Sequence, residues 1–218
     1  MTDLKYPIGR VEIVPYSEKV KNDCMADILF LPRMLEYAVL NLNEDHLHTP
    51  YREGGWSSNQ IIHHLADSHM NAFIRFKLGL TEEHPTIKPY DQNKWAETID
   101  VKNVPVNNSI TLLHALHRRW HALLITLNEH DFMRTVYHPE QQRDISLWQL
   151  LQIYAWHGKH HATQIIQLKN IIVFFLLKMG GGILQILKPQ KKYITNFRII
   201  YIIENLNIAI LPQKISTI

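Results

Sequence analysis

The chain has 218 residues, enough for one domain with a substantial core. Its only cysteine, Cys24, excludes a disulfide within the chain and a zinc site built from cysteines. The positive net charge of +3 comes from residues 171–218, which carry six basic groups and one acidic group. Residues 1–170 hold 17 basic and 19 acidic groups, a net charge of about −2. This part of the chain therefore offers no positively charged surface for nucleic acid.

The first predicted helix follows an extended N-terminal arm. Residues 1–16 contain two prolines and a glycine, which favour an irregular arm. Ser17 has the residue type and position of a helix N-cap, and apolar residues recur every three or four positions from there to Asn43. Because a proline inside a helix removes a backbone donor, Pro32 is expected to kink or split this helix.

A second amphipathic helix is predicted over residues 59–80, with Ser57 or Ser58 as its cap. His64 lies beside Ile61 and Leu65 on its inward side. The following residues, 81–108, contain three prolines and are predicted to be an irregular link with a short helical turn near 94–98. A link of this length in a compact domain is often a lid or a pocket wall.

Two further helices complete the predicted all-α fold. One is expected to begin at Ser109 as its N-cap and to run to Leu127; a turn-rich connection follows at 132–144. Ser146 is expected to cap the last helix, whose apolar stripe continues into His157 and His161. Four long helices with polar residues facing inward are typical of a helical bundle that holds a metal site.

The pair His157 and His161 is the strongest candidate for metal binding. Residues four apart lie on one face of a helix, so their imidazoles can share one ion. A catalytic zinc site needs a third protein ligand and an open fourth position, and His64 on the second helix is the best candidate for that ligand. The alternative is a pair of half-buried histidines with ordinary hydrogen-bond partners.

Neighbouring residues supply candidates for supporting roles. Asp67, three residues after His64, could orient a ligand or act as a base, or could simply be an exposed helix carboxylate. His63 points about 100° away from His64 on a helix and is not expected to be a ligand. His160 is expected to support the site or face solvent, or else to replace one ligand of the pair, and His69 is read as an ordinary bundle histidine. The residue after His157 is glycine, so the glutamate base of HExxH peptidases is absent.

The composition changes abruptly near Asn170. Residues 171–218 contain thirteen isoleucines and no histidine or aspartate. Their apolar runs are too short and interrupted for a membrane span, which needs roughly 20 apolar residues. We therefore divide the chain into a metal-binding bundle domain at 1–170 and an atypical tail at 171–218 with no assigned function. The first residues, MTDLKYPIGR, lack the apolar core of a signal peptide, and a cytoplasmic location is expected.

Six motifs occur in order along residues 4–169: YPIG at 6–9, TPYREGGWS at 49–57, HHLADSHMNAFIRFKL at 63–78, LHRRW at 116–120, YHPE at 137–140 and WHGKHHATQI at 156–165. Together they resemble the DinB-like superfamily and, within it, the YfiT-type metal-dependent hydrolases. The resemblance implies an up-down-down-up four-helix bundle in which His64, His157 and His161 hold a divalent metal. It also implies a cytoplasmic homodimer with one Zn²⁺, or another divalent ion such as Ni²⁺, in each chain.

The function expected from these features is hydrolysis of a small molecule by water that the metal activates. Relatives in the superfamily resemble thiol S-transferases of the bacillithiol type, so the same site could instead bind a low-molecular-weight thiol. A non-catalytic metal-binding stress protein is the third reading. No membrane or nucleic-acid partner is expected.

Overall fold

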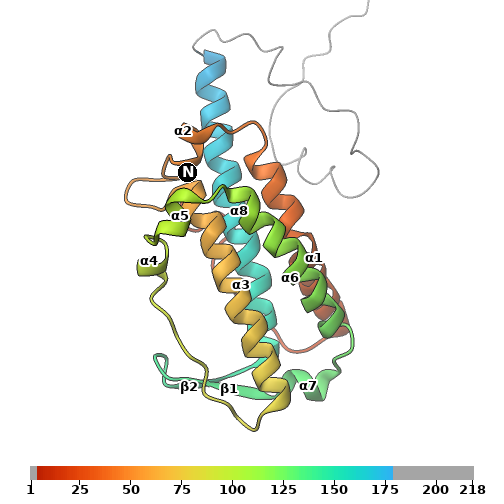
Figure 1. Ribbon diagram of the computed structural model, residues 1–218. Coiled ribbons are helices and arrows are strands. Elements are labelled where there is room, and N and C mark those ends of the chain that lie inside the picture. The colour runs from red at the N-terminus through yellow and green to blue at the C-terminus, as the bar shows by residue number, and fades with distance from the viewer. Residues whose placement is uncertain (1–3, 179–218) are drawn as a thin grey trace, which may run out of the picture. The chain divides into compact units, whose positions relative to one another are not determined.

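Four long helices form the bundle predicted from the sequence. The structure, a computed structural model, describes residues 4–178, so most of the isoleucine-rich tail lies outside the described residues. The long helices are α1 (Glu18–Val39), α3 (Ser58–Thr81), α6 (Val106–Leu124) and α8 (Leu147–Lys178). In the bundle, α1 contacts α6 and α8, while α3 contacts the same two helices from the other side (Figure 1).

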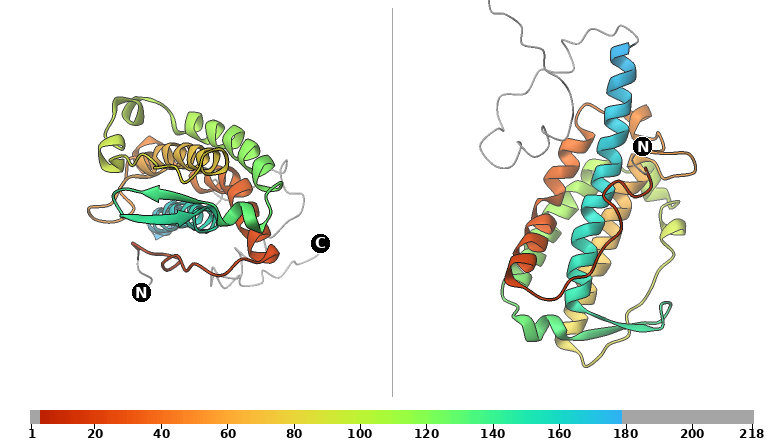
Figure 2. Two further views of the ribbon diagram at one scale, coloured as in Figure 1. Left: turned by 90° about the horizontal axis from the view of Figure 1, so that it is seen from below. Right: turned by 180° about the vertical axis from the view of Figure 1, so that it is seen from behind.

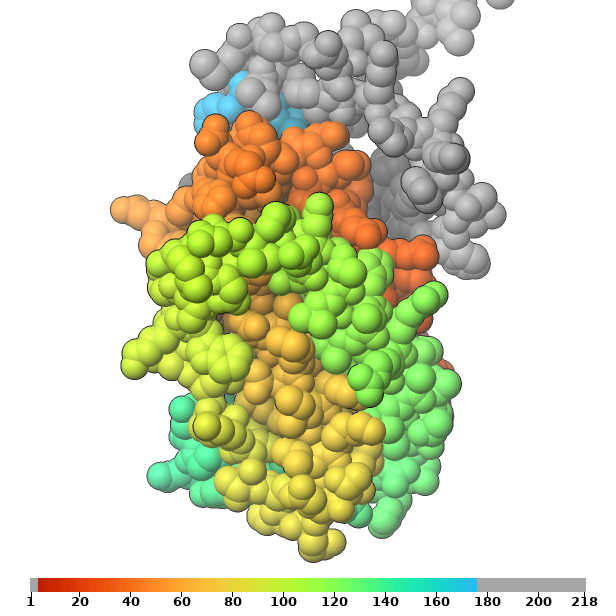
Figure 3. All heavy atoms as spheres, viewed as in Figure 1, coloured from red at the N-terminus to blue at the C-terminus, as the bar shows by residue number. Residues whose placement is uncertain are grey.

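The helices run up, down, down and up, as expected. Helices α1 and α8 point one way, and α3 and α6 point the other way (Figure 1). Because the consecutive helices α3 and α6 are parallel, the chain must return along α3, whose 24 residues span about 36 Å. The predicted irregular link makes this return, with α4 (Gln92–Trp95) and α5 (Ile99–Asn103) inside it. In Figure 3 the link and α6 flank an exposed strip of α3.

Side-chain caps set the starts of three long helices. Ser17 Oγ accepts a hydrogen bond from the Val20 amide at the start of α1. Ser57 exchanges hydrogen bonds with Gln60 at the start of α3. Ser146 makes the equivalent pair with Gln149 at the start of α8. Such caps satisfy amides that have no partner within the helix, and each was predicted from the sequence.

One prediction about helix limits was wrong, and for Pro32 the structure excludes one of the two expected outcomes, the split. Helix α6 begins at Val106, directly after Pro105, so Ser109 is not its N-cap. Ser109 lies inside the helix, and its hydroxyl oxygen lies 2.8 Å from His63 Nδ1 instead of capping a helix start. Helix α1 is not split at Pro32, which lies inside its range. The proline instead leaves the carbonyl of Ile28, four residues earlier, without its helical donor.

Short elements close the end of the bundle where α3 ends and α8 begins. They are α7 (Glu129–Met133) and the antiparallel strands β1 (Thr135–His138) and β2 (Arg143–Ser146). A further short helix, α2 (Glu44–Leu47), lies elsewhere, before the start of α3. The hairpin lies across α8 in the end-on view of Figure 2. The sequence predicted only a turn-rich connection here, because the strands are too short to show an alternating pattern. The paired side chains of Val136 and Ile145 are buried.

The core consists of two apolar clusters with histidines between them. One cluster includes Ala72, Trp120 and Ala155, and the other includes Ala66, Leu113 and Ala162. His69 on α3, His117 on α6 and the pair His157 and His161 on α8 occupy the intervening positions, whereas His64 lies among residues of the second cluster. The bundle therefore has a polar layer across its middle.

The N-terminal arm lies along α8 (Figure 2). The carbonyl of Val14 accepts hydrogen bonds from Trp148 and Gln152, and the carbonyl of Gly9 accepts one from Trp156. These contacts confirm the extended arm. Among the helices of residues 4–178, none has a stretch long and apolar enough to cross a membrane.

Candidate metal centre

Three histidines from two helices converge in the polar layer. His64 lies on α3, and His157 and His161 lie one turn apart on α8. Each offers a ring nitrogen, and the three nitrogens lie within 4.8 Å of one another. Within the described part of the chain, this is the group of histidine, cysteine and acidic side chains arranged to hold a metal. The structure thus brings together the residues that the sequence selected.

The geometry of the group suits a tetrahedral ion. His64 Nε2 and His157 Nε2 are 3.1 Å apart. This is close to the separation of roughly 3.3 Å between two nitrogens that each lie about 2.0–2.1 Å from one tetrahedral zinc. The rings are nearly perpendicular in pairs: 73° for His64 and His157, 77° for His64 and His161, and 89° for His157 and His161. Such orientations let three lone pairs meet at one point from different directions.

Burial keeps the imidazoles neutral, which is the form that binds metal. It lowers the pKa of His64 to about 4 and that of His161 to about 3, since an apolar environment disfavours the charged ring. His64 is buried, whereas His157 and His161 are half-buried, so the group is accessible from one side. Trp56 covers part of that side: its ring centroid is 4.7 Å from that of His64 and 6.4 Å from that of His161.

Gln164, which the sequence analysis did not single out, holds His161 in place. Its Oε1 lies 2.8 Å from His161 Nδ1, and its amide nitrogen donates to the carbonyl of Lys5, 3.1 Å away. The same nitrogen lies 3.0 Å from His160 Nε2. Because the amide nitrogen is the donor in these two contacts, Oε1 must accept from His161 Nδ1–H, and Nε2 of His161 is left free to bind an ion.

The other histidines near the group face different partners. His63 contacts Ser109 on α6 and the carbonyl of Val104, at 2.8 Å and 3.0 Å, which agrees with its predicted direction away from the site. His160 stacks on Trp156 with centroids 4.5 Å apart and meets Gln164, so it supports the site rather than belonging to the three-nitrogen group.

Asp67 is half-buried on α3, and its electrostatic neighbour is Asp100 rather than a site histidine. Burial, followed by repulsion from Asp100, raises the pKa of Asp67 to about 6. Across residues 4–178 its carboxylate has no hydrogen bond to His64, His157 or His161. A role as base or orienting group therefore stays a prediction.

The variant Asp67→Asn is expected to raise the free energy of unfolding at pH 7. The folded state binds this proton more tightly than the unfolded state, so the carboxyl's contribution to stability is present below pH 3.8 and is lost as the pH rises through about 6. After solvent screening we expect a gain of about 0.5–1 kcal/mol at pH 7 and none near pH 4. Urea unfolding at both pH values measures it. A loss of about 100-fold or more in activity in the same variant would assign Asp67 the catalytic role.

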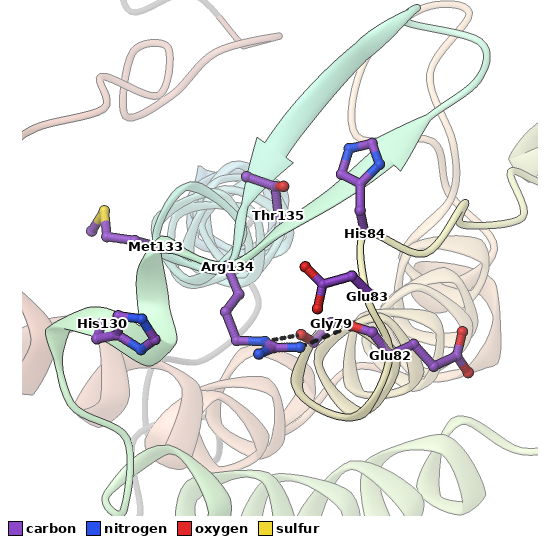
Figure 4. Close-up of a pocket in the computed structure, with 8 residues that line it drawn as sticks. All are labelled: Gly79, Glu82, Glu83, His84, His130, Met133, Arg134 and Thr135. Carbon is purple, nitrogen blue, oxygen red and sulfur yellow. Dashed lines mark hydrogen bonds between the residues drawn. The ribbon is translucent and has the colours of Figure 1, made fainter.

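A separate cavity of about 350 Å³ lies at the far end of α3 (Figure 4). Arg134 points into it but donates to the carbonyls of Gly79 and Glu82, at 2.6 Å and 2.9 Å. It therefore caps the C-terminus of α3. None of the three site histidines lines this cavity.

The fold and the histidine group together define a class of proteins: up-down-down-up helical bundles in which three histidines from two helices form a candidate metal site. A family model described as the DinB superfamily matches residues 29–165. The chain belongs to the DinB superfamily.

Its relatives are named for metal-dependent hydrolysis. A protein of Oceanobacillus iheyensis named "Putative metal-dependent hydrolase" is 49% identical over 165 residues, which cover 75% of this chain and 95% of the relative. One of the same name from Bacillus cereus is 45% identical over 171 residues, or 78% of this chain and 98% of the relative. A solved structure described as "YfiT from Bacillus subtilis is a probable metal-dependent hydrolase with an unusual four-helix bundle topology" matches with a TM-score of 0.76 and 43% identity, over 78% of this chain and 98% of that one.

Proposed function

We propose that this protein is a metal-dependent hydrolase in which His64, His157 and His161 hold one divalent ion, zinc or a similar metal. The observation that carries the proposal is the convergence of their three ring nitrogens within 4.8 Å. The names of the relatives, which describe metal-dependent hydrolases, support the same class of activity. An ion held by these three neutral imidazoles would keep its full charge and would supply the activation of water as a nucleophile near neutral pH.

The chain's own residues prepare the site for this chemistry. Burial keeps His64 and His161 uncharged. Gln164 Oε1 accepts a hydrogen bond from Nδ1–H of His161, so that Nε2 of His161 faces the other two rings. Trp56 packs against the rings of His64 and His161, which shields that side of the group from bulk water.

The test is a comparison of hydrolysis with thiol transfer. The purified full chain, loaded with Zn²⁺ or Ni²⁺, should hydrolyse members of a panel of small esters and amides, and a chelator should remove that activity. Metal-dependent coupling of a low-molecular-weight thiol to an electrophile, without hydrolysis, would replace the hydrolase by a thiol S-transferase. Stoichiometric metal with neither activity would indicate a non-catalytic metal-binding protein.

A further inference from the structure

Two buried histidines outside the metal group lie in line with it. His69 on α3 and His117 on α6 are both 0% exposed. Trp120 contacts both rings edge-on, and Tyr154 contacts that of His69. A buried polar ring in such surroundings requires hydrogen-bond partners. Each of the two finds one in the other: His69 Nδ1 and His117 Nε2 are 2.9 Å apart.

A backbone carbonyl fixes the direction of this contact. His117 Nδ1 lies 2.6 Å from the carbonyl oxygen of Ile28. A carbonyl oxygen can only accept, so Nδ1 of His117 carries the proton. The oxygen is available because the residue four positions later, which would donate to it in a regular helix, is Pro32. The proline in α1 therefore creates the acceptor on which His117 is anchored.

The hydrogen bond between His117 and the Ile28 carbonyl also determines which ring nitrogens of His69 and His157 carry a proton. Burial lowers the pKa of His117 to about 4, so the ring is neutral at pH 7 and its Nε2 carries a lone pair. His69 must then donate from Nδ1, which leaves its Nε2 as an acceptor. That atom faces His157 Nδ1 at 3.5 Å, and the two rings are stacked with centroids 5.7 Å apart. His157 therefore holds its proton on Nδ1, and its Nε2 is the bare nitrogen that faces His64.

We propose that His117 and His69 are positioning residues that fix the tautomer and the orientation of His157, so that Nε2 of His157 is always presented to the metal. This proposal rests on the proposed metal function of the three-histidine group. A ligand histidine commonly gives its second N–H to a carboxylate, a carbonyl or water. Here the acceptor is a second imidazole, and a third imidazole and the Ile28 carbonyl hold that one in turn.

The chain of contacts from the Ile28 carbonyl through His117 and His69 to His157 is called the relay below. It is tested by two replacements of His69. Leucine is similar in size but offers no acceptor, so His69→Leu should weaken metal binding by about 10–100-fold. Glutamine carries an oxygen near the position of Nε2, and His69→Gln should recover most of the loss. Affinity is measured by competition with a chromophoric chelator. His138→Leu, which removes a buried histidine elsewhere in the fold, should leave the affinity unchanged.

The tautomer is read independently in metal-free protein by long-range ¹H–¹⁵N NMR of the imidazoles. The wild type should show His157 protonated on Nδ1, and His69→Leu should populate the Nε2–H form. His117→Leu, one link further away, should shift His157 in the same direction and serves if His69→Leu does not fold. Wild-type affinity together with an unchanged His157 tautomer in both leucine variants would overturn the relay. A wild type that binds no metal would refute the proposed function, while the tautomer measurement would still judge the relay.

Discussion

Replacing His161 by alanine is expected to abolish stable metal binding. The wild type should retain about one divalent ion per chain after dialysis, as three histidine ligands and an open position allow. His161→Ala leaves two ligands on different helices, His64 and His157, and should retain less than roughly a tenth of that amount. Elemental analysis of the dialysed proteins measures the difference.

The matched control is His130→Ala, which removes an exposed histidine far from the group. It should keep the wild-type metal content, so a loss in both variants would point to non-specific binding by a histidine-rich chain. Full metal content in His161→Ala would rule out the three-histidine centre. His160→Ala separates the remaining possibility, because it should retain metal if His160 only supports Gln164.

Metal-free protein is expected to lose stability steeply as the pH falls from about 6.5 towards 4. Burial holds the pKa of His64 and His117 at about 4 and that of His161 at about 3, below the ordinary value of 6.5. Between these values the unfolded chain binds more protons than the folded one, so acid favours unfolding. The stability contributed by the neutral rings is complete above pH 6.5 and is lost towards the folded pKa. For His117 alone this amounts to about 3 kcal/mol.

Urea unfolding after treatment with a chelator, at half-unit steps from pH 7 to pH 5, measures this dependence. The free energy of unfolding should fall by more than ~1.4 kcal/mol for each pH unit, which is the limit for one titrating group, because several rings titrate together. His117→Gln removes one of them and should make the slope shallower, whereas His130→Gln, at an exposed position, should not. A stability that is constant over this range would show that the rings are not held neutral by the fold.

The sequence singled out the three histidines that the fold brings together, because their spacing carries the information. A pair four apart on a helix must share a face, and the apolar residues around His64 showed that it points inward. The caps at Ser17 and Ser146 were equally predictable, since each satisfies a local rule. The DinB-like motifs extended the prediction to the order of the helices.

The parts that the sequence did not disclose depend on partners distant along the chain. Periodicity placed His69 on a helix but could not show that it would meet His117, 48 positions away. Pro32 was expected to disturb α1, and nothing local indicated that a side chain of α6 would take up the freed carbonyl of Ile28. Ser109 looked like a cap until His63 supplied a different partner for its hydroxyl.

The residue at position 158 also depends on a partner distant along the chain, because α8 packs against α1 there. A Cβ atom added to Gly158 would lie 2.5 Å from Leu31 Cδ2, so even a methyl group there must displace the buried side chain of Leu31. The glutamate that follows the first histidine in HExxH peptidases would need still more repacking at this place. Packing against Leu31 therefore favours glycine at this position.

The arm along α8 has a practical consequence for how the protein is prepared. The carbonyl of Lys5 is bound by the amide of Gln164, which in turn holds the ring of His161. An affinity tag, a protease scar or a shortened N-terminus therefore acts two hydrogen bonds away from His161, a proposed metal ligand. Samples whose metal loading is to be compared should share one N-terminal sequence, and a C-terminal purification handle is the safer choice.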